Sequence, residues 1–297
     1  MKEKGSLMPV LALLLVTMIW GSGFVATTMA ISAGTSTEWI LVMRFIPGSI
    51  LLLLFFFRRI RKTNRVHLIH GVVNGLMLFV AFFAQTAGQA LTTVSTAAFL
   101  TSTYVIMIPF MEWILTRRRP DTRIFILSLL ALLGILLLSL SDDMHLDISA
   151  GNLLILLCAV FYALEIFYLG TFCRGDDPVL LTFWQLLTVG ILALCTVLVR
   201  SIPITETQFR GSVLPCLYLS VFPTTLCYFL QAWSQMRLPP AESSIIMSSE
   251  GMFGMGFSLI LGLETFRWNM LFGGLLVTFS VIFVSGLPGG KKRAKKG

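Results

Sequence analysis

Residues 83–89 read FAQTAGQ, and residues 229–235 read FLQAWSQ. A phenylalanine and two glutamines recur here at the same spacing, so that Phe83, Gln85 and Gln89 return as Phe229, Gln231 and Gln235. The shift of 146 positions, from 83 to 229, is close to half of the 297-residue chain. A repeat on this scale predicts two halves built from corresponding elements.

The sequence around this repeat is too apolar for a soluble protein. Hydrophobic residues make up 56% of the chain and charged residues 12%, with a mean hydropathy of +0.88, whereas soluble domains carry about 25% charge. Its apolar stretches are about 19–24 residues long, enough to cross a hydrocarbon core of about 30 Å. The predicted spans are 8–31, 37–57, 67–90, 94–115, 122–140, 150–171, 180–199, 212–235, 241–262 and 268–286. We therefore predict an all-α polytopic membrane protein with ten transmembrane helices, and we interpret the first span as a helix that is retained.

The distribution of basic residues predicts the orientation. The net charge is +8, but the basic residues alternate between connections. With the N-terminus inside, 18 of the 22 Lys and Arg face the cytoplasm, three (Arg200, Arg210 and Arg267) face outward, and Arg44 lies within a span. This asymmetry is the positive-inside pattern, which predicts that both termini lie in the cytoplasm. The predicted location is the inner (plasma) membrane of the cell. It also argues for lipid rather than nucleic acid as the partner of the basic charge, including the tail at 287–297.

The repeat and the charge pattern together predict an inverted architecture. A unit of five helices has an odd number of spans, so a second copy crosses the membrane in the opposite direction. The predicted units are 8–140 and 150–286, followed by the basic tail. Two inverted five-helix repeats around a central cavity are a common build of secondary transporters, which bind a small solute near the membrane midplane. With a slightly smaller shift, Trp20 corresponds to Tyr162 and Arg44 to Gln185.

Ionisable residues inside the predicted spans are the first candidates for a transport site. A charge at the bilayer centre costs about 2.5–3.5 kcal/mol on insertion scales, so each needs a partner or a function. Glu165 and Glu250 lie near the middle of their spans, and Arg44 lies about a third of the way into its own. Either acid would bind a proton or a cationic group, and Arg44 would bind a carboxylate. The alternative is a buried Arg–Glu pair that only fixes helix packing.

Amides and aromatic residues form the second group of candidates. Gln85 and Gln89 are four residues apart and share one helical face, as do Gln231 and Gln235, and amides in lipid need partners, so these faces should look inward. They would line the cavity or join the two repeats, and Gln185 would be a further polar contact. Aromatic side chains would wall such a cavity and contact a cation, although lone aromatics in helices are commonly packing residues. The aromatic candidates are Trp20, Tyr104, Tyr168, Trp184 and Tyr228.

Several other classes of site are not expected. The chain has no Walker-type phosphate loop, no soluble domain and no expected cofactor. The histidines lie beside basic or acidic connections, so the sequence predicts no metal site, and the five cysteines are interpreted as packing residues. An integral membrane enzyme acting on lipid-type substrates is the alternative function, but its clustered acidic motif is missing. A channel or a sensor is a third alternative. Oligomeric state is left open between monomer and homodimer.

Four segments resemble one known family. They are IWGSGFV (Ile19–Val25), MRF (Met43–Phe45), FLTSTYVIMIP (Phe99–Pro109) and AESSIIMSSEGMF (Ala241–Phe253). Their order and spacing are similar to those of EamA transporters in the drug/metabolite transporter superfamily. The resemblance implies ten helices, an inverted repeat, cytoplasmic termini, a cavity that opens to each side in turn, and export of a metabolite.

The chain departs from that family's pattern at three points. The turn after the fourth span reads RRRP where the family often has Gly-Glu, and the turn after the ninth reads GLE with Glu264. Gly251 stands where a proline often follows the acid that corresponds to Glu250. For this reason the substrate of better-known relatives is not carried over.

Overall fold

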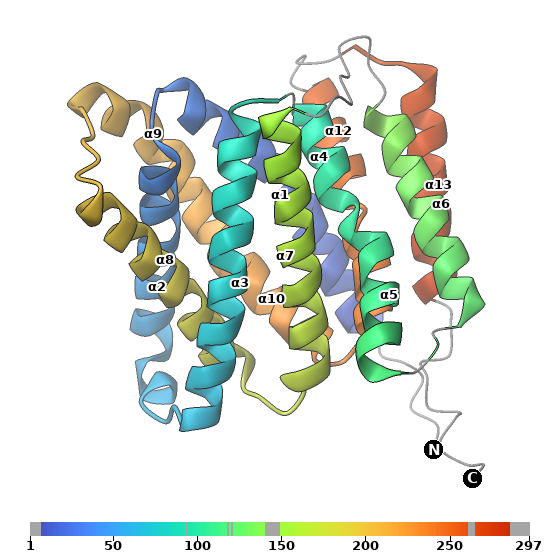
Figure 1. Cartoon of the computed structure of the whole chain (residues 1–297), viewed down its shortest axis with the longest axis horizontal. Helices are drawn as coiled ribbons and strands as arrows, with labels where there is room; N and C mark the ends of the chain where they lie inside the picture. The colour runs from blue at the N-terminus through green and yellow to red at the C-terminus, as the bar shows by residue number, and fades with distance from the viewer. Residues whose placement is uncertain are drawn as a thin grey trace.

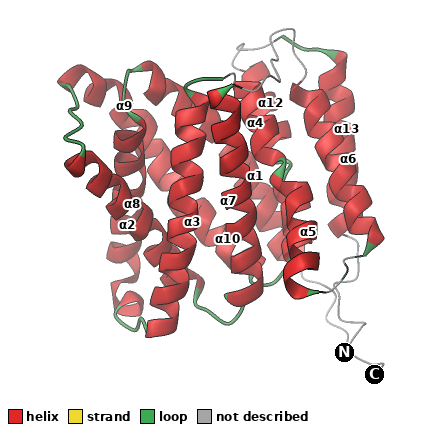
Figure 2. Cartoon of the chain, in the orientation of Figure 1, coloured by secondary structure: helices red, strands yellow, loops and turns green. Residues whose placement is uncertain are grey.

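The protein is a bundle of helices over all the residues that the structure describes. This computed structural model describes residues 7–92, 94–117, 119, 121–139, 149–260 and 265–285, and these ranges contain no strand. Figure 2 shows helices joined by short loops. Seven helices of the described chain are long and apolar enough to cross a membrane. The predicted class, an all-helical polytopic membrane protein, is confirmed at this level, and the count of ten spans stays a prediction.

The first half begins with three long helices, α1 (Leu7–Ser32), α2 (Thr37–Ile60) and α3 (Arg65–Gln89). The predicted span at 94–115 is divided at Thr103 into α4 (Val94–Ser102) and α5 (Tyr104–Thr116). Helix α6 (Thr122–Ser139) completes this half.

The second half begins with α7 (Ala150–Phe172) and α8 (Pro178–Val199). The next helical stretch contains a π-helical segment and consists of α9 (Glu206–Leu219), η1 (Ser220–Leu226) and α10 (Cys227–Gln235). A divided stretch follows, α11 (Pro240–Met247) and α12 (Glu250–Ile260), and then α13 (Trp268–Ser285). The predicted tail at 287–297 lies outside the described residues.

Short polar caps turn the chain between helices. Asn64 caps α3 by accepting a hydrogen bond of 2.8 Å from the His67 N–H, and Asp177 caps α8 by accepting one of 2.9 Å from Val179. Thr205 and Gln208 form a reciprocal capping box at the start of α9. A helix start leaves backbone N–H groups without intrahelical partners. These side chains accept hydrogen bonds from such groups and so fix the residue at which each helix begins.

The packing follows membrane rather than aqueous rules. Large apolar side chains face outward, among them Phe55, Leu198 and Leu214, while many amides, hydroxyls and three acids are buried inside. Apolar outward faces suit lipid, and buried polar groups need internal partners there. Two apolar cores fill the bundle, one around α5, α6, α11 and α13, the other between α2, α3 and α8. Trp20 and Tyr162 pack against both cores, so they mark the region between them.

Helix pairs that are distant in sequence pack against each other across the bundle. α2 packs on α8, α3 on α7, α1 on α9 and α10, and α6 on α13, which lie side by side at one edge in Figure 1. Glycine permits the closest approaches. A Cβ at Gly21 would lie 2.6 Å from the backbone nitrogen of Gly254, and one at Gly75 would lie 2.5 Å from Thr188. These positions admit no larger residue without a shift of the helices.

Candidate functional site

A buried cavity lies between the two apolar cores. The empty space between its walls, together with the adjoining open solvent, amounts to about 550 Å³, and the walls come from both halves of the chain. Eight of the candidates named from the sequence line it: Trp20, Arg44, Gln85, Gln89, Tyr104, Tyr228, Gln231 and Glu250. Three others, Glu165, Gln185 and Gln235, are fully buried and lie outside the lining.

Arg44 presents a buried guanidinium to this cavity. Its Nε donates a 2.6 Å hydrogen bond to Oγ1 of Thr224, in the π-helical segment η1. The guanidinium carbon lies 4.3 Å from the centre of the Phe82 ring, a cation–π arrangement. Arg44 forms no ion pair with any residue that the structure describes. The Arg–Glu pair considered above as the alternative is therefore not formed within those residues.

Glu250 is the acid that lines the cavity. It begins α12, just after the break at Ser248 and Ser249, and its side chain is 6% exposed. Within the described chain no group donates a hydrogen bond to its carboxylate and no cation pairs with it. Tyr104 lines the same cavity at the start of α5, and its buried hydroxyl likewise lacks a hydrogen-bond partner among described residues. Both polar groups are available to a bound solute or ion.

Glu165 organises a group of amides behind the cavity wall. Its two carboxylate oxygens accept hydrogen bonds from Gln185, at 2.9 Å, and from Gln231, at 3.2 Å. Gln231 also donates to Gln235 at 3.4 Å, and Gln231 alone of these four residues lines the cavity. Glu165 thus contacts the cavity through Gln231. The cavity roles predicted for Glu165 and Gln185 stay predictions. In the structure Glu165 holds Gln231 in position, and Gln185 in turn holds Glu165.

The remaining polar contacts hold the aromatic walls. Tyr162 donates a 3.1 Å hydrogen bond to Oε1 of Gln85, whose amide nitrogen lies 3.4 Å from the Thr101 hydroxyl. The indole of Trp20 donates a 2.8 Å bond to the carbonyl of Pro223, inside η1. Proline lacks an N–H, and the bulged π-helical turn at this kink turns a carbonyl toward the indole. Pro223 thus lies inside the π-helical segment that replaces regular α-helix at this point.

The cavity wall repeats with the spacing found in the sequence. Four pairs of lining residues are each 146 positions apart: Phe82 and Tyr228, Gln85 and Gln231, Thr101 and Met247, Tyr104 and Glu250. Two further pairs, Trp20 with Tyr162 and Phe24 with Ile166, are 142 positions apart. The interrupted helices obey the same spacing, since α5 begins at Tyr104 and α12 at Glu250. Corresponding positions of the two halves therefore meet at one cavity.

Sequence reasoning missed several wall residues. Phe82 and Thr101 line the cavity but were not singled out, nor was Thr224, which accepts the Arg44 hydrogen bond from outside the lining. Tyr168 and Trp184 were considered but lie outside the lining. Phe82 could have been found, because it is three residues before Gln85 and so shares its helical face. Thr224 had no comparable signal, since its hydroxyl reaches Arg44 through the π-helical turn.

A helical bundle with lipid-compatible outer faces and an internal polar cavity defines the class of membrane transport proteins. Comparison with known sequences gives the particular family. The model of the EamA-like transporter family matches residues 7–140 and 149–286, which is nearly the whole chain. The chain belongs to the EamA-like transporter family.

Two individual proteins are similar to this chain. A protein of Archaeoglobus fulgidus, described as an uncharacterized transporter, is 30% identical over 276 residues, covering 93% of this chain and 85% of its own. A protein of known crystal structure matches with a TM-score of 0.75 at 14% identity, covering 94% of this chain and 96% of that one. The first supports a transporter, and the second shows the shared fold alone.

Proposed function

We propose that this chain is a secondary-active transporter that moves a small amino-acid-like solute, or an amphiphilic cation, across the plasma membrane by alternating access, as an exporter. One observation carries the proposal. Arg44 and Glu250 line the same buried cavity, and neither forms an ion pair with a described residue. A buried charge that lacks a partner is costly, so each group calls for one from outside the protein.

The two charges complement a zwitterion. The guanidinium of Arg44 suits a carboxylate, since it presents several donors in a fixed plane. The carboxylate of Glu250 suits an ammonium group or a proton, which is the basis for proposing proton coupling. The same cavity is lined by the rings of Trp20, Phe82 and Tyr228, with Trp20 and Tyr228 at 5.5 Å between centroids. These rings would hold the apolar part of the solute.

The proposed inverted repeat would account for alternating access. In the repeat, α1 corresponds to α7, α2 to α8, α3 to the α9–α10 stretch, and α6 to α13. The contact of α3 with α7 therefore corresponds to the contact of the α9–α10 stretch with α1, and both contacts are present. The contacts of α2 with α8 and of α6 with α13 each join a helix to its own counterpart. This is the behaviour expected of ten spans related by a pseudo-two-fold axis, with a site on that axis. Rocking of one repeat against the other would open the cavity to each side in turn.

The proposed orientation follows from where the basic turns lie. Arg59, beside the α2–α3 turn, pairs with Asp177 in the α7–α8 turn, so both turns lie at one end of the bundle. At the opposite end, Arg200 after α8 pairs with Glu38 at the start of α2. The first end carries most of the basic loop residues and would face the cytoplasm, as would both termini.

Flux into liposomes tests the proposal. Purified protein is reconstituted and challenged with amino acids, nucleosides, polyamines and drug-like cations, with and without a pH gradient. We expect flux of at least one zwitterion or amphiphilic cation above protein-free liposomes. A prior thermal-shift screen selects candidates, because a ligand that binds the folded state raises its melting temperature. If no member of the panel shows flux or stabilises the protein, the proposal is refuted and a membrane enzyme is favoured.

A further inference from the structure

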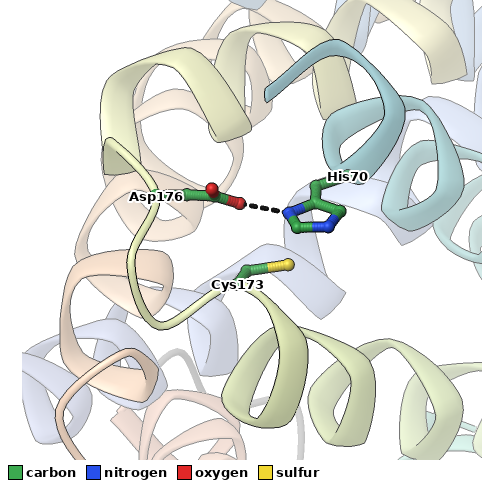
Figure 3. Close-up of side chains that lie close together, drawn as sticks. All are labelled: His70, Cys173 and Asp176. Atoms are coloured by element: carbon green, nitrogen blue, oxygen red, sulfur yellow. Dashed lines mark hydrogen bonds and ion pairs between the residues drawn. The ribbon is translucent and has the colours of Figure 1, made fainter. Parts of the chain in front are cut away.

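A second polar cluster lies outside the cavity lining, at the end of the bundle that carries the α2–α3 and α7–α8 turns. It joins His70 of α3, Cys173 just after α7, and Asp176 in the turn before α8. One donor atom from each lies within 4.8 Å of the other two. Figure 3 shows the imidazole and carboxylate joined by a hydrogen bond, with the thiol beside them. The Nδ1 atom of His70 is 2.5 Å from a carboxylate oxygen of Asp176.

The donor set of this cluster has a defined preference. An imidazole nitrogen, a sulfur and a carboxylate oxygen together suit zinc and similar borderline-soft divalent ions, whereas magnesium and calcium prefer oxygen alone. A simple ion pair between His70 and Asp176 would involve only the imidazole and the carboxylate, whereas this cluster also includes the sulfur of Cys173. We propose that His70, Cys173 and Asp176 form a binding site for a divalent transition-metal ion of the zinc class. The proposal is independent of the transport function.

A second histidine, His67, lies next to this group of three donors. It lies one turn before His70 on the same face of α3, and its Nε2 is 4.0 Å from the second carboxylate oxygen of Asp176. The Nδ1 atom of His67 is buried and has no hydrogen-bond partner among the described residues. With His67 the site would have four donors, which is the number that structural zinc sites use.

Neighbouring residues hold the donors in place. The side chain of Asn74 bridges two of them, since its Nδ2 donates to the Cys173 sulfur at 3.6 Å and to the backbone carbonyl of His70 at 3.0 Å. The ring of Tyr168 meets the His70 ring edge-on at 5.9 Å. Such contacts orient metal ligands and commonly alter affinity by about 10–100-fold when removed.

Metal binding would change the protonation of the thiol. Burial, assisted by the charge of Asp176, raises the pKa of Cys173 to about 12, so the free protein holds a neutral thiol there. Formation of the sulfur–metal bond breaks the S–H bond and releases the proton to water. The proton shared by Nδ1 of His70 and the Asp176 carboxylate moves to Nε2 of the neutral ring, which leaves lone pairs on Nδ1 and on the carboxylate for the ion. The bound ion would tie the start of α3 to the turn between α7 and α8, two segments about 100 residues apart.

Cobalt(II) spectroscopy tests the site directly. Protein carrying no histidine tag is purified in detergent, treated with chelator and reductant, and titrated with cobalt chloride. We expect one equivalent to bind with the strong visible bands of a four-coordinate site and a sulfur-to-cobalt charge-transfer band. One equivalent of zinc should abolish both. Absence of the charge-transfer band in the wild-type chain would overturn the proposal, whatever the variants do.

Variants assign the ligands. Cys173→Ser should remove the charge-transfer band, whereas Cys195→Ser, which alters an exposed cysteine on α8, should retain it. His70→Ala and Asp176→Asn should each weaken zinc binding at least tenfold, and Asn74→Leu about tenfold. Size-exclusion profiles and melting curves establish that each variant is folded. If Cys173→Ser is folded and keeps the band while Cys195→Ser loses it, the metal is bound at another cysteine and the assignment is wrong.

Discussion

Tyr104 and Glu250 begin the second halves of two interrupted helices, stand 146 positions apart in sequence, and line the same cavity. Each follows a break of one or two residues, at Thr103 in one case and at Ser248 and Ser249 in the other. Interrupted helices at the midplane free backbone and side-chain groups for a ligand. Here the corresponding positions carry a phenol and a carboxylate, so one site presents different chemistry from its two halves.

The carboxylate is the first target for mutation. Glu250→Gln keeps the shape of the side chain and removes its ability to bind a proton or an ammonium group. We expect flux in liposomes to fall about tenfold or more, equivalent to ~1.4 kcal/mol, and dependence on the pH gradient to disappear. Glu206→Gln is the matched control, because Glu206 is exposed on α9 and pairs only with Arg210. Equal flux in the wild type and Glu250→Gln would exclude Glu250 from the mechanism.

The guanidinium should govern recognition of the solute's carboxylate. Arg44→Gln is expected to weaken binding of an amino-acid substrate about 10–100-fold and to leave its decarboxylated amine nearly unchanged. Comparing the two ligands in one thermal-shift titration separates recognition from stability, since loss of the bonds to Thr224 and Phe82 affects both alike. If both ligands weaken equally, Arg44 acts as a structural residue.

The sequence alone predicted the helical membrane class because that class depends on composition and on the length of apolar runs. It also selected eight residues that line the cavity, for three physical reasons. Charged side chains in a span need a partner or a function, amides four residues apart share a face, and aromatic rings suit the wall of a cavity that binds a cation. The repeat added Tyr162, which lines the cavity together with Trp20.

The remaining features depend on the packing of distant segments. Glu165 and Glu250 look alike in the sequence, yet one is enclosed by two glutamines and the other faces the cavity. Cys173 and Asp176 show no metal-binding spacing with His70, and only the approach of α3 to the α7–α8 turn brings them together. Three-dimensional proximity of this kind leaves no periodic pattern along the chain.

Glu165 should act through Gln231. The Glu165 carboxylate accepts one hydrogen bond from the side-chain amide of Gln185 and one from that of Gln231. Glu165→Gln replaces one of its two oxygens with an NH₂ group, which would then face the NH₂ group of one of these glutamines. We expect a loss of about 1–3 kcal/mol of stability and reduced flux. A double-mutant cycle with Gln231→Leu checks the route, since residues in contact give non-additive effects. Strictly additive losses of flux would mean that the two side chains work separately.

The contact between Gly21 and Gly254 sets the distance between α1 and α12. A Cβ at Gly21 would lie 2.6 Å from the Gly254 nitrogen and 2.9 Å from the Phe253 carbonyl carbon, both of which are backbone atoms that cannot rotate away. Gly21→Ala should therefore push the helices apart and destabilise the protein by about 1–3 kcal/mol.

Gly256 provides the control for this prediction, because it lies on α12 and a Cβ there meets no heavy atom within 4 Å. Gly256→Ala should be neutral or stabilising by up to about 1 kcal/mol, since alanine is the better helix former. Melting curves in detergent compare the two variants with the wild type. Because Glu250 lies one turn before Gly254 on α12, Gly21→Ala should also reduce flux, whereas Gly256→Ala should preserve it. Similar melting temperatures for the two variants would show that the α1–α12 contact adjusts without cost.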